Sequence, residues 1–457
     1  MSELDYFFQP KSIAIIGASD NLRFGYSTTM YLLNSEFKTY AVNPKKKELF
    51  GQPTYNNIKD IPDEIELALI LVRNEFVLEA VKDCVEKRVK GIIIESAGFA
   101  ETGVDKYIKI QEEIVKLSKE SNVRIIGPNC VGLTNFNNQF TTTEPSFERI
   151  LKGGISVIAQ SGVLGNVFLD WASSQKIGFS KVITLGNKID IDEVDMLEYL
   201  DKDPDTKIIT LYLEGTKRGK ELFATLKSMS KPIIILKNGR SELGSNAVRS
   251  HTASLAGNDR IYDAIFRQSP GIFRVNNFYE MFNIAQVFST QPLPKGKNIA
   301  VITGSGSLGI LACDQIEKYG MSLARLSEES IQKVSSIIPN WVSINGTIDL
   351  GPSLFQTFPN SIETIIKDEN VDCVLFIYSV PRWPLEKLKL PVSPLLRRLK
   401  KNASKNNKPC IVCAFGSRWV YDYLLKSTSI FGIPLMRRIK HAIKAFKLMY
   451  EYQKIKK

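Results

Sequence analysis

The chain has very little histidine: His251 and His441 are the only two in its 457 residues. A metal centre built from several histidines is therefore excluded. Every long apolar run is interrupted by glycine or charge before 18 residues, and the acidic start has no basic stretch ahead of an apolar one. We therefore expect neither a membrane-spanning helix nor a secretory signal.

Cysteine is also sparse, and its six residues are scattered through apolar segments. This usage is typical of free, buried thiols in a reducing compartment, so we expect the protein to be cytoplasmic. Cys410 and Cys413 are close together, but the string KPCIVCAFG has the pattern of a buried strand. No second cysteine pair or nearby histidine completes a zinc site, and we predict no metal site.

Acidic residues are in the minority. Sixty Lys and Arg against 48 Asp and Glu give a formal charge of +12, which suits a polyanionic partner such as nucleic acid, ATP or coenzyme A. The longest basic stretch, residues 397–408, has the pattern of a solvated helix end, with no aromatic and basic RNA-binding motif beside it. We therefore do not expect nucleic acid as the partner. Hydrophobic residues at 44% and charged residues at 24% indicate an ordinary folded protein.

Short runs rich in Ile and Val alternate with longer amphipathic stretches, which indicates repeated βαβ units and parallel sheets. For residues 1–142 we predict a doubly wound sheet, in which ligands bind at the carboxyl ends of the strands. Its strands are expected in SIAIIGA, TYAVNP, LALILV, GIIIESA and RIIGPN, with a helix in EFVLEAVKDCVEKRV.

Two more α/β units are expected, at 143–290 and 291–457, separated by the proline-flanked linker QPLPKGK. Residues 155–165 (ISVIAQSGVLG) resemble residues 299–309 (IAVITGSGSLG), so the last two units are predicted to be copies of one fold. The other strands of these units are expected in KVITLGNK, KIITLYLEG, KPIIILKNG, CVLFIYS and KPCIVCAFG, with helices around 279–287 and at the basic C-terminus.

The carboxyl ends of the first unit's strands carry small and polar residues suited to a phosphate-bearing ligand. The first turn, GASDNLRFG, lacks the dinucleotide fingerprint, and VNPKKKE follows the second strand, where dinucleotide enzymes place an acid. Lysines 45–47 suit a phosphorylated ribose, as in NADP or coenzyme A, although a merely solvated lysine run is the alternative. The predicted cofactor-binding residues are Gly17, Ala18, Ser19, Asn43, Pro44, Lys45, Ser96, Ala97, Gly98, Pro128 and Asn129. Cys130 is expected to be a packed thiol rather than a nucleophile.

In the second unit, Ser161 and Gly162 begin a helix directly after a strand and are predicted to bind phosphate. The G-x-S-x-G spacing of a nucleophile elbow is absent. Further along, GNKIDIDEVD gathers four carboxylates at Asp190, Asp192, Glu193 and Asp195. These could hold Mg²⁺ or could cap the start of a helix, and the sequence leaves both readings open.

His251 lies in GRSELGSNAVRSHTASLAG, residues 239–257, a segment rich in Gly, Ser, Ala and Asn that we expect to form a long exposed loop. An accessible imidazole can accept a phosphoryl group and act as a covalent relay. Glu214 lies at the end of KIITLYLEG, one strand before the strand KPIIILK that leads into this segment, and is the natural carboxylate to orient the imidazole, with Ser161 and Gly162 as the anion cradle. His441 is expected to be structural or solvated.

Eight strings resemble the α subunits of archaeal-type ADP-forming acyl-CoA synthetases, including acetate–CoA ligases, which are relatives of succinyl-CoA synthetase. They are GASDNLRFG, VNPKKKELFG, SAGFAETG, IIGPNCVG, AQSGVLG, GNKIDIDEVD, YLEG and above all SHTASLAG. The resemblance covers essentially the whole chain. It implies a Rossmann-like CoA-binding domain followed by two flavodoxin-like, succinyl-CoA-synthetase-like domains. It also implies that His251 is a phosphohistidine, that Glu214 orients it, and that acid, CoA and ATP are converted to acyl-CoA, ADP and phosphate.

This family also has an ATP-grasp module, for which the chain has no segment left over, so the resemblance implies a separate β subunit that holds ATP or ADP and Mg²⁺. The small-molecule partners would be a carboxylic acid, CoA and phosphate, in a hetero-oligomer without nucleic acid or membrane. Two alternatives stay open: a non-catalytic CoA-binding regulator, and an NADP-dependent oxidoreductase suggested by the VNPKKK string. The sequence does not identify the acyl group.

Overall fold

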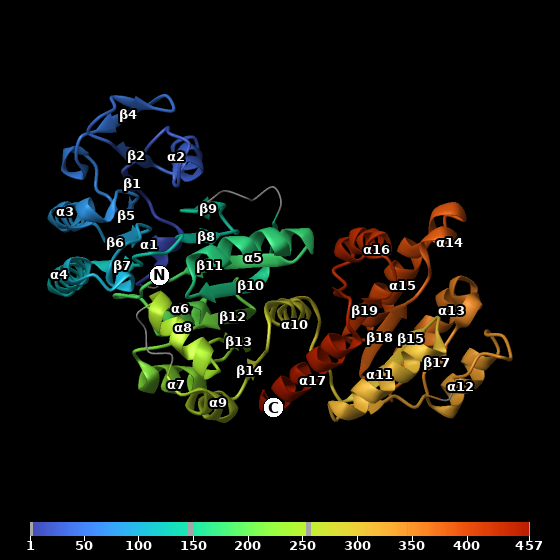
Figure 1. Cartoon of the computed structure of the whole chain (residues 1–457). Coiled ribbons are helices and arrows are strands. Elements are labelled where there is room, and N and C mark those ends of the chain that lie inside the picture. The colour runs from blue at the N-terminus through green and yellow to red at the C-terminus, as the bar shows by residue number, and fades with distance from the viewer. Residues whose placement is uncertain (1–2, 144–149, 253–256, 345, 457) are drawn as a thin grey trace. The chain divides into compact units, whose positions relative to one another are not determined.

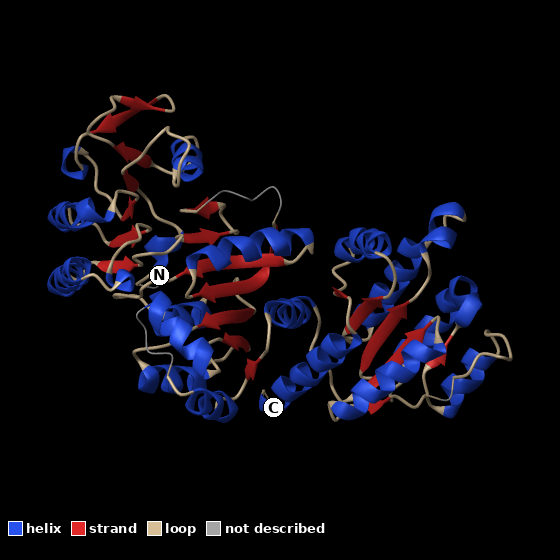
Figure 2. Cartoon of the chain, in the orientation of Figure 1, coloured by secondary structure: helices blue, strands red, loops and turns tan. Residues whose placement is uncertain are grey.

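The computed structural model describes residues 3–143, 150–252, 257–344 and 346–456. The chain forms two compact units, 1–276 and 277–457. The first unit contains two mainly parallel sheets and the second contains one, and helices lie beside all three sheets (Figures 1 and 2). The mixed α/β class expected from the sequence is confirmed. A division into three domains at residues 142 and 290 stays a prediction.

The first sheet has the strand order β3-β4-β2-β1-β5-β6-β7. Five of these strands are the five predicted from apolar runs, and they pair in parallel: β1 (Ile13–Ile16), β2 (Thr39–Val42), β5 (Leu67–Ile70), β6 (Gly91–Ile94) and β7 (Arg124–Ile126). The short edge strands β3 (Glu48–Leu49) and β4 (Gln52–Tyr55) were not expected. The connecting helices are α2 (Tyr26–Leu33), α3 (Asn74–Glu86), which was predicted, and α4 (Asp105–Ser121).

The second sheet has the order β14-β13-β12-β10-β11-β8-β9. Its parallel strands are β10 (Leu151–Ala159), β11 (Gly178–Thr184), β12 (Ile208–Leu213), β13 (Ile233–Lys237) and β14 (Ile272–Arg274). Two antiparallel strands, β8 (Leu133–Asn135) and β9 (Phe140–Thr141), join beyond β11 although they precede residue 142. The helices are α5 (Gly162–Ser174), α6 (Glu193–Lys202), α7 (Gly219–Ser228), α8 (Glu242–Thr252) and α9 (Asp259–Gln268).

One hydrophobic core runs through both sheets of the first unit. It includes Phe7 and Phe8 of the N-terminal helix α1 (Asp5–Phe8), and Phe8 stacks on Tyr199 of α6 with ring centroids 4.7 Å apart. The N-terminal helix therefore ties the first sheet's segment to the second sheet's helices. Because such a shared core makes the two sheets one packed body, functional groups from both can form one site.

The second unit is built on β16 (Ser322–Leu323), β15 (Asn298–Thr303), β18 (Cys373–Tyr378), β19 (Cys410–Ala414) and β20 (Leu435–Met436), in that order, with β17 (Ile348–Asp349) paired to β15. The strand expected at the start of the repeat IAVITGSGSLG and those expected in CVLFIYS and KPCIVCAFG are confirmed. The helices are α10 (Phe278–Thr290), α11 (Gly306–Lys318), α12 (Glu328–Ser335), α13 (Leu354–Lys367), α14 (Arg382–Lys387), α15 (Val392–Lys405), α16 (Arg418–Ile430) and α17 (Ile439–Ile455). Within the described residues, every helix is too short or too polar to cross a bilayer.

The expectation of a long exposed loop over residues 239–257 is wrong for Glu242–Thr252, which form α8. Ser241 starts this helix, because its Oγ accepts a hydrogen bond from the Gly244 amide at 3.1 Å and its carbonyl accepts one from the Ser245 amide at 2.8 Å. A serine in this position satisfies amides that a helix start leaves unpaired. The expected exposure holds at Leu243, whose side chain is 83% exposed.

Candidate functional site

The predicted cofactor-binding residues lie at one edge of the first sheet, because β1, β2, β6 and β7 run in parallel and end there. Gly17 has a φ of +90°, and a Cβ at this position would lie 2.8 Å from Val72 Cγ1. Only glycine fits a turn this close to the neighbouring strand end. Ala18, Ser19 and Pro128 are buried, so a ligand would reach these mainly through their backbone.

Asn43 joins the first turn to the lysine run. Its Nδ2 donates to the Ala18 carbonyl at 2.8 Å, and its Oδ1 accepts from the Lys45 amide at 2.8 Å. Pro44 and Lys45 are exposed at this point, and Lys46 forms a 3.2 Å ion pair with Asp20. The side chain of Asn43 therefore fixes the backbone of the loop, while Lys45 projects a cation at the predicted ligand edge.

A hydrogen-bond network connects the later strand ends of the first sheet to the second sheet. The Ser96 hydroxyl donates to the Val72 carbonyl, and the Ser96 carbonyl accepts from the Asn129 amide at 2.9 Å. Glu101 accepts from the Gly98 amide at 2.6 Å and from Asn187 Nδ2 at 2.6 Å. Since Asn187 follows β11, the two sheet edges are held together at this point; Ala97, the remaining predicted contact, is exposed.

Cys130 is a packed thiol, as the sequence predicts. Its side chain is buried, its Sγ donates to the Ile94 carbonyl at 3.3 Å, and burial raises the pKa of the thiol above its usual value. A raised pKa disfavours the thiolate that a nucleophile requires. Cys410 and Cys413 lie buried on β19, also as expected.

Ser161, Gly162 and Glu214 come together at the edge of the second sheet. Gln160 makes the connection: its Oε1 accepts from the Glu214 amide at 2.9 Å and the Gly215 amide at 3.1 Å. Ser161 occupies the N-cap position of α5 without a side-chain hydrogen bond to the helix. The α5 start therefore keeps the amide donors and the positive dipole end that attract an anion.

Glu214 is buried and accepts a hydrogen bond at 3.1 Å from Tyr212, whose hydroxyl also accepts from Asn238 at 3.2 Å. Lys237 lies at the end of β13 and is fully buried, and its Nζ is 4.6 Å from the centre of the Tyr262 ring. Burial lowers the pKa of Lys237 to about 8. Gln160, Tyr212 and Lys237 were not predicted from the sequence. The signal for Lys237 is a lysine at the end of the apolar run KPIIIL.

His251 lies in the last turn of α8, and its side chain is outside the part of the structure that is described. The helix itself contacts the 3₁₀ helix η2 (Ala100–Thr102), which contains the Glu101 that binds Gly98 and Asn187. The backbone of the His251 segment is therefore near the edge where the two sheets meet. The accessibility of its imidazole and its pairing with Glu214 stay predictions.

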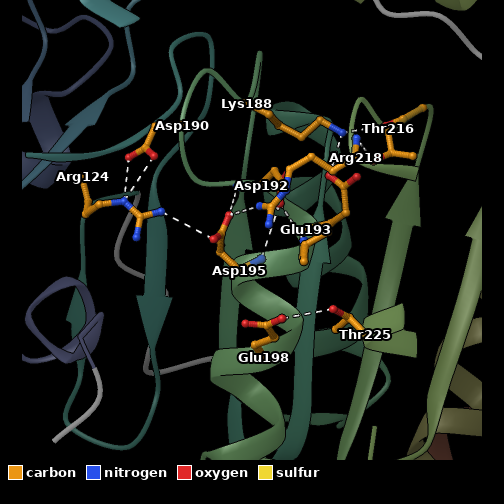
Figure 3. A network of polar contacts seen from close by, with 12 residues as sticks. Arg124, Lys188, Asp190, Asp192, Glu193, Asp195, Glu198, Thr216, Arg218 and Thr225 are labelled. Carbon is orange, nitrogen blue, oxygen red and sulfur yellow. Dashed lines mark hydrogen bonds and ion pairs between the residues drawn. The ribbon is translucent and has the colours of Figure 1, made fainter. Parts of the chain in front are cut away.

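The four carboxylates after β11 are neutralised by basic side chains (Figure 3). Asp192 caps α6 by accepting hydrogen bonds from the Val194 and Asp195 amides. Arg124 pairs with Asp190 at 3.0 Å, and Lys188 pairs with Glu193 at 2.8 Å. Arg218 pairs with both Asp192, at 3.1 Å, and Asp195, at 3.0 Å. Of the two readings of this cluster, the helix cap is confirmed, but Asp192 and Glu193 are buried rather than solvated. Across the described ranges, we find no group of three or more His, Cys, Asp or Glu side chains placed to hold a metal ion.

Two family models match the chain: a CoA binding domain over residues 11–135 and a succinyl-CoA ligase like flavodoxin domain over residues 152–288. Subunit alpha of the ADP-forming acetate–CoA ligase II of Pyrococcus furiosus is 37% identical, over 95% of this chain and 94% of that one. The ADP-forming acetate–CoA ligase II of Archaeoglobus fulgidus is 35% identical over 99% of this chain, which spans 67% of that protein.

Solved structures also resemble this chain over nearly its whole length. A protein of Pyrococcus horikoshii OT3 with a known crystal structure matches with a TM-score of 0.86 and 33% identity, covering 99% of both chains. The dinucleotide forming acetyl-coenzyme A synthetase 1 of Ca. Korarchaeum cryptofilum, solved with phosphate and ADP, matches with a TM-score of 0.88 and 29% identity, covering 99% of this chain and 97% of that one. The chain belongs to the family of ADP-forming acetate–CoA ligases and their α subunits.

Proposed function

We propose that this chain is the α subunit of an ADP-forming acyl-CoA synthetase that works through an acyl phosphate and a phosphorylated His251. The overall reaction is acid + CoA + ATP ⇌ acyl-CoA + ADP + phosphate. The observation that carries the proposal is that the α5 start and buried Glu214 lie together at the edge of the second sheet, and that the helix bearing His251 follows β13, the strand paired with that of Glu214. A carboxylate and an anion cradle beside a histidine are what a phosphoryl relay needs.

Coenzyme A is proposed to bind at the edge of the first sheet, over the turn at Gly17 and beside Lys45. The match to a CoA binding domain over residues 11–135 supports coenzyme A over NADP as the ligand. Backbone amides of the turn after β1 would bind a phosphate, and the exposed Lys45 side chain supplies a cation. Ser96, Gly98 and Asn129 would line the same edge.

In the acyl-CoA-consuming direction, a phosphate oxygen attacks the thioester carbonyl carbon; the C–S bond breaks, and acyl phosphate and the CoA thiolate form. A ring nitrogen of His251 then attacks the phosphorus, the P–O bond to the acyl group breaks, and the carboxylate leaves. The phosphoryl group finally passes from His251 to ADP. The amides at the α5 start, beside Ser161 and Gly162, would stabilise charge on the transferring group.

Glu214 is proposed to accept a hydrogen bond from the other ring nitrogen of His251 and so to fix its tautomer. The bond from Tyr212 and the contacts of Gln160 to two backbone amides hold the Glu214 segment in place. A preorganised carboxylate costs little reorganisation when the phosphohistidine forms. The retention of both His251 and Glu214 argues against a regulator that has lost the reaction.

The nucleotide and Mg²⁺ are proposed to bind a separate ATP-grasp β subunit. The name "subunit alpha" of the Pyrococcus furiosus relative supports an enzyme of two kinds of chain. We also propose a cytoplasmic location, because the six cysteines are free thiols, which is usual in a reducing compartment.

The test is phosphorylation of the chain by labelled ATP in the presence of Mg²⁺ and the β subunit. The wild-type chain should acquire an acid-labile label, and His251→Ala should lose it. The matched control is His441→Gln, because His441 is the only other histidine and should not carry the label. Label that persists in His251→Ala would contradict the assignment.

A further inference from the structure

A small cavity of about 40 Å³ lies beside the first turn of α2. Its lining includes Arg23, Ser27, Thr28, Glu95, Val131 and Thr143. The wall is therefore mostly polar, and it includes buried Glu95 and the hydroxyl-bearing residues Ser27, Thr28 and Thr143. A cavity of this size exceeds the roughly 30 Å³ that one water molecule occupies in the liquid, so it can take a substituent of one or two heavy atoms.

Glu95 is the unusual member of this lining. The residue is only 5% exposed, and its Oε1 lies beside the Thr142 hydroxyl without a hydrogen bond of good geometry within the described part of the chain. A buried oxygen without a good partner is costly, so its retention calls for a ligand that pairs with it. Burial raises the pKa of Glu95 well above its usual value and so favours the protonated form, which can donate a hydrogen bond.

The cavity lies between the two anion sites proposed above. Glu95 directly precedes Ser96, Ala97 and Gly98 of the proposed CoA edge. Val131, which also lines the cavity, packs against the start of α5, since a Cβ on Gly162 would lie 2.7 Å from Val131 Cγ2. The reacting carbonyl must lie between the CoA thiol and the phosphate, so the chain attached to that carbonyl would reach this space.

We propose that this cavity is the acyl subsite and that Glu95 selects a short carboxylic acid bearing a hydroxyl group. The inference rests on the proposed function, because it places the acyl group between the CoA and phosphate sites. A hydroxyl on the acid accepts a hydrogen bond from Glu95 and can donate one to a hydroxyl oxygen of the lining. An unsubstituted acid of the same length leaves the Glu95 oxygen unpaired, which disfavours it.

The experiment compares glycolate, acetate and glycine as substrates of the α chain with its β subunit, by measuring ATP- and CoA-dependent ADP formation. The wild-type enzyme should show a kcat/KM for glycolate at least ~10-fold above that for acetate. Glu95→Met, which has a similar length and no hydrogen-bonding acid, should lower the glycolate-to-acetate ratio by ~10- to 100-fold. Glu95→Gln retains a donor and should keep the ratio within a few-fold of wild type.

The matched control is Glu198→Gln on the exposed face of α6, outside the cavity, which should leave the ratio unchanged. Labelling of His251 by ATP reports on the relay without an acid. If His251 is labelled but Glu95→Met keeps the wild-type ratio, or if wild type prefers acetate, the acyl subsite is wrong and the relay stands. A preference for glycine would mean an ionised Glu95 and would also overturn the proposal. If His251 is never labelled, the proposed function fails first.

Discussion

Glu214 illustrates how a single residue gains its proposed role from its surroundings. The sequence places it at the end of a strand, and the structure adds burial, the bond from Tyr212 and the backbone contacts of Gln160. Each of these fixes the position of the carboxylate before any reaction takes place. Its proposed contribution is therefore orientation, which a neutral isostere would only partly retain.

We predict that Glu214→Gln slows phosphorylation of His251 about 10- to 100-fold, because an amide neither fixes the tautomer as strongly nor offsets the positive charge of the ring. The measurement is the single-turnover rate of labelling by ATP with the β subunit. Glu221→Gln, an exposed residue of α7, is the control for the same chemical change and should label at the wild-type rate. Equal rates in Glu214→Gln and Glu221→Gln would remove Glu214 from the relay.

His251 and Glu214 could be proposed from the sequence because a lone histidine in a polar segment and an acid at a strand end are visible in one dimension. Gln160, Lys237 and Glu95 could not, because their significance lies in burial and in contacts with residues far along the chain. Gln160, for example, binds backbone amides 54 and 55 residues later. A polar residue next to an apolar strand is a weak signal until the fold shows what it touches.

At the scale of elements, the central strands were predictable because each is a compact apolar run. The edge strands β3, β4, β8 and β9 are two to four residues long and contain Glu, Gln, Asn or Thr, so tertiary pairing rather than composition defines them. The α8 helix was missed because Gly and Ser dominate the visible pattern of residues 239–257. Leu243, Ala247 and Arg249 favour a helix that Ser241 can start.

The start of α6 gives a prediction at this scale. Asp192 caps the helix and pairs with Arg218 at 3.1 Å, so Asp192→Ala removes the cap and leaves the arginine with Asp195 alone in this cluster. We expect the free energy of unfolding to fall by about 1–2 kcal/mol. Asp192→Asn keeps a capping oxygen and should lose less than half as much. Denaturant unfolding measures both, and equal losses would show that charge, rather than capping, decides stability here.

At the scale of the whole molecule, the hydrophobic cores divide as the compact units do. The core clusters of the first unit contain residues up to Ile272, and that of the second begins at Ala300. The proposed CoA, phosphate and acyl sites all belong to the first unit, whereas the buried His441 belongs to the second. Bound CoA should therefore change the unfolding transition of the first unit, and a lower pH should change that of the second.

His441 sets the expected response to acid. It is buried on α17, and its Nδ1 lies 3.2 Å from Asn283 Nδ2 of α10. Burial lowers its pKa to about 4. The nearby cations Lys440, Arg438 and Lys444 also lower this pKa, whereas Glu280 raises it. The unfolded chain binds a proton at an ordinary pKa of about 6.5, and the folded chain does not until about 4. The contribution of neutral His441 to the free energy of unfolding is therefore fully present above pH 6.5. It is lost as the pH falls toward 4, which lowers the free energy of unfolding by up to about 3 kcal/mol.

We accordingly predict two calorimetric transitions in the full chain. CoA at about 100 times its dissociation constant should stabilise the first unit by about 2.7 kcal/mol and raise its unfolding temperature by a few degrees. The unfolding temperature of the second unit should not change. Lowering the pH from 7.5 to 5 should lower the transition of the second unit more in wild type than in His441→Gln, because glutamine does not titrate. A single transition that responds to both CoA and His441→Gln would show that the two units unfold together. If CoA raised only the transition of the second unit, the proposed binding site on the first sheet would be wrong.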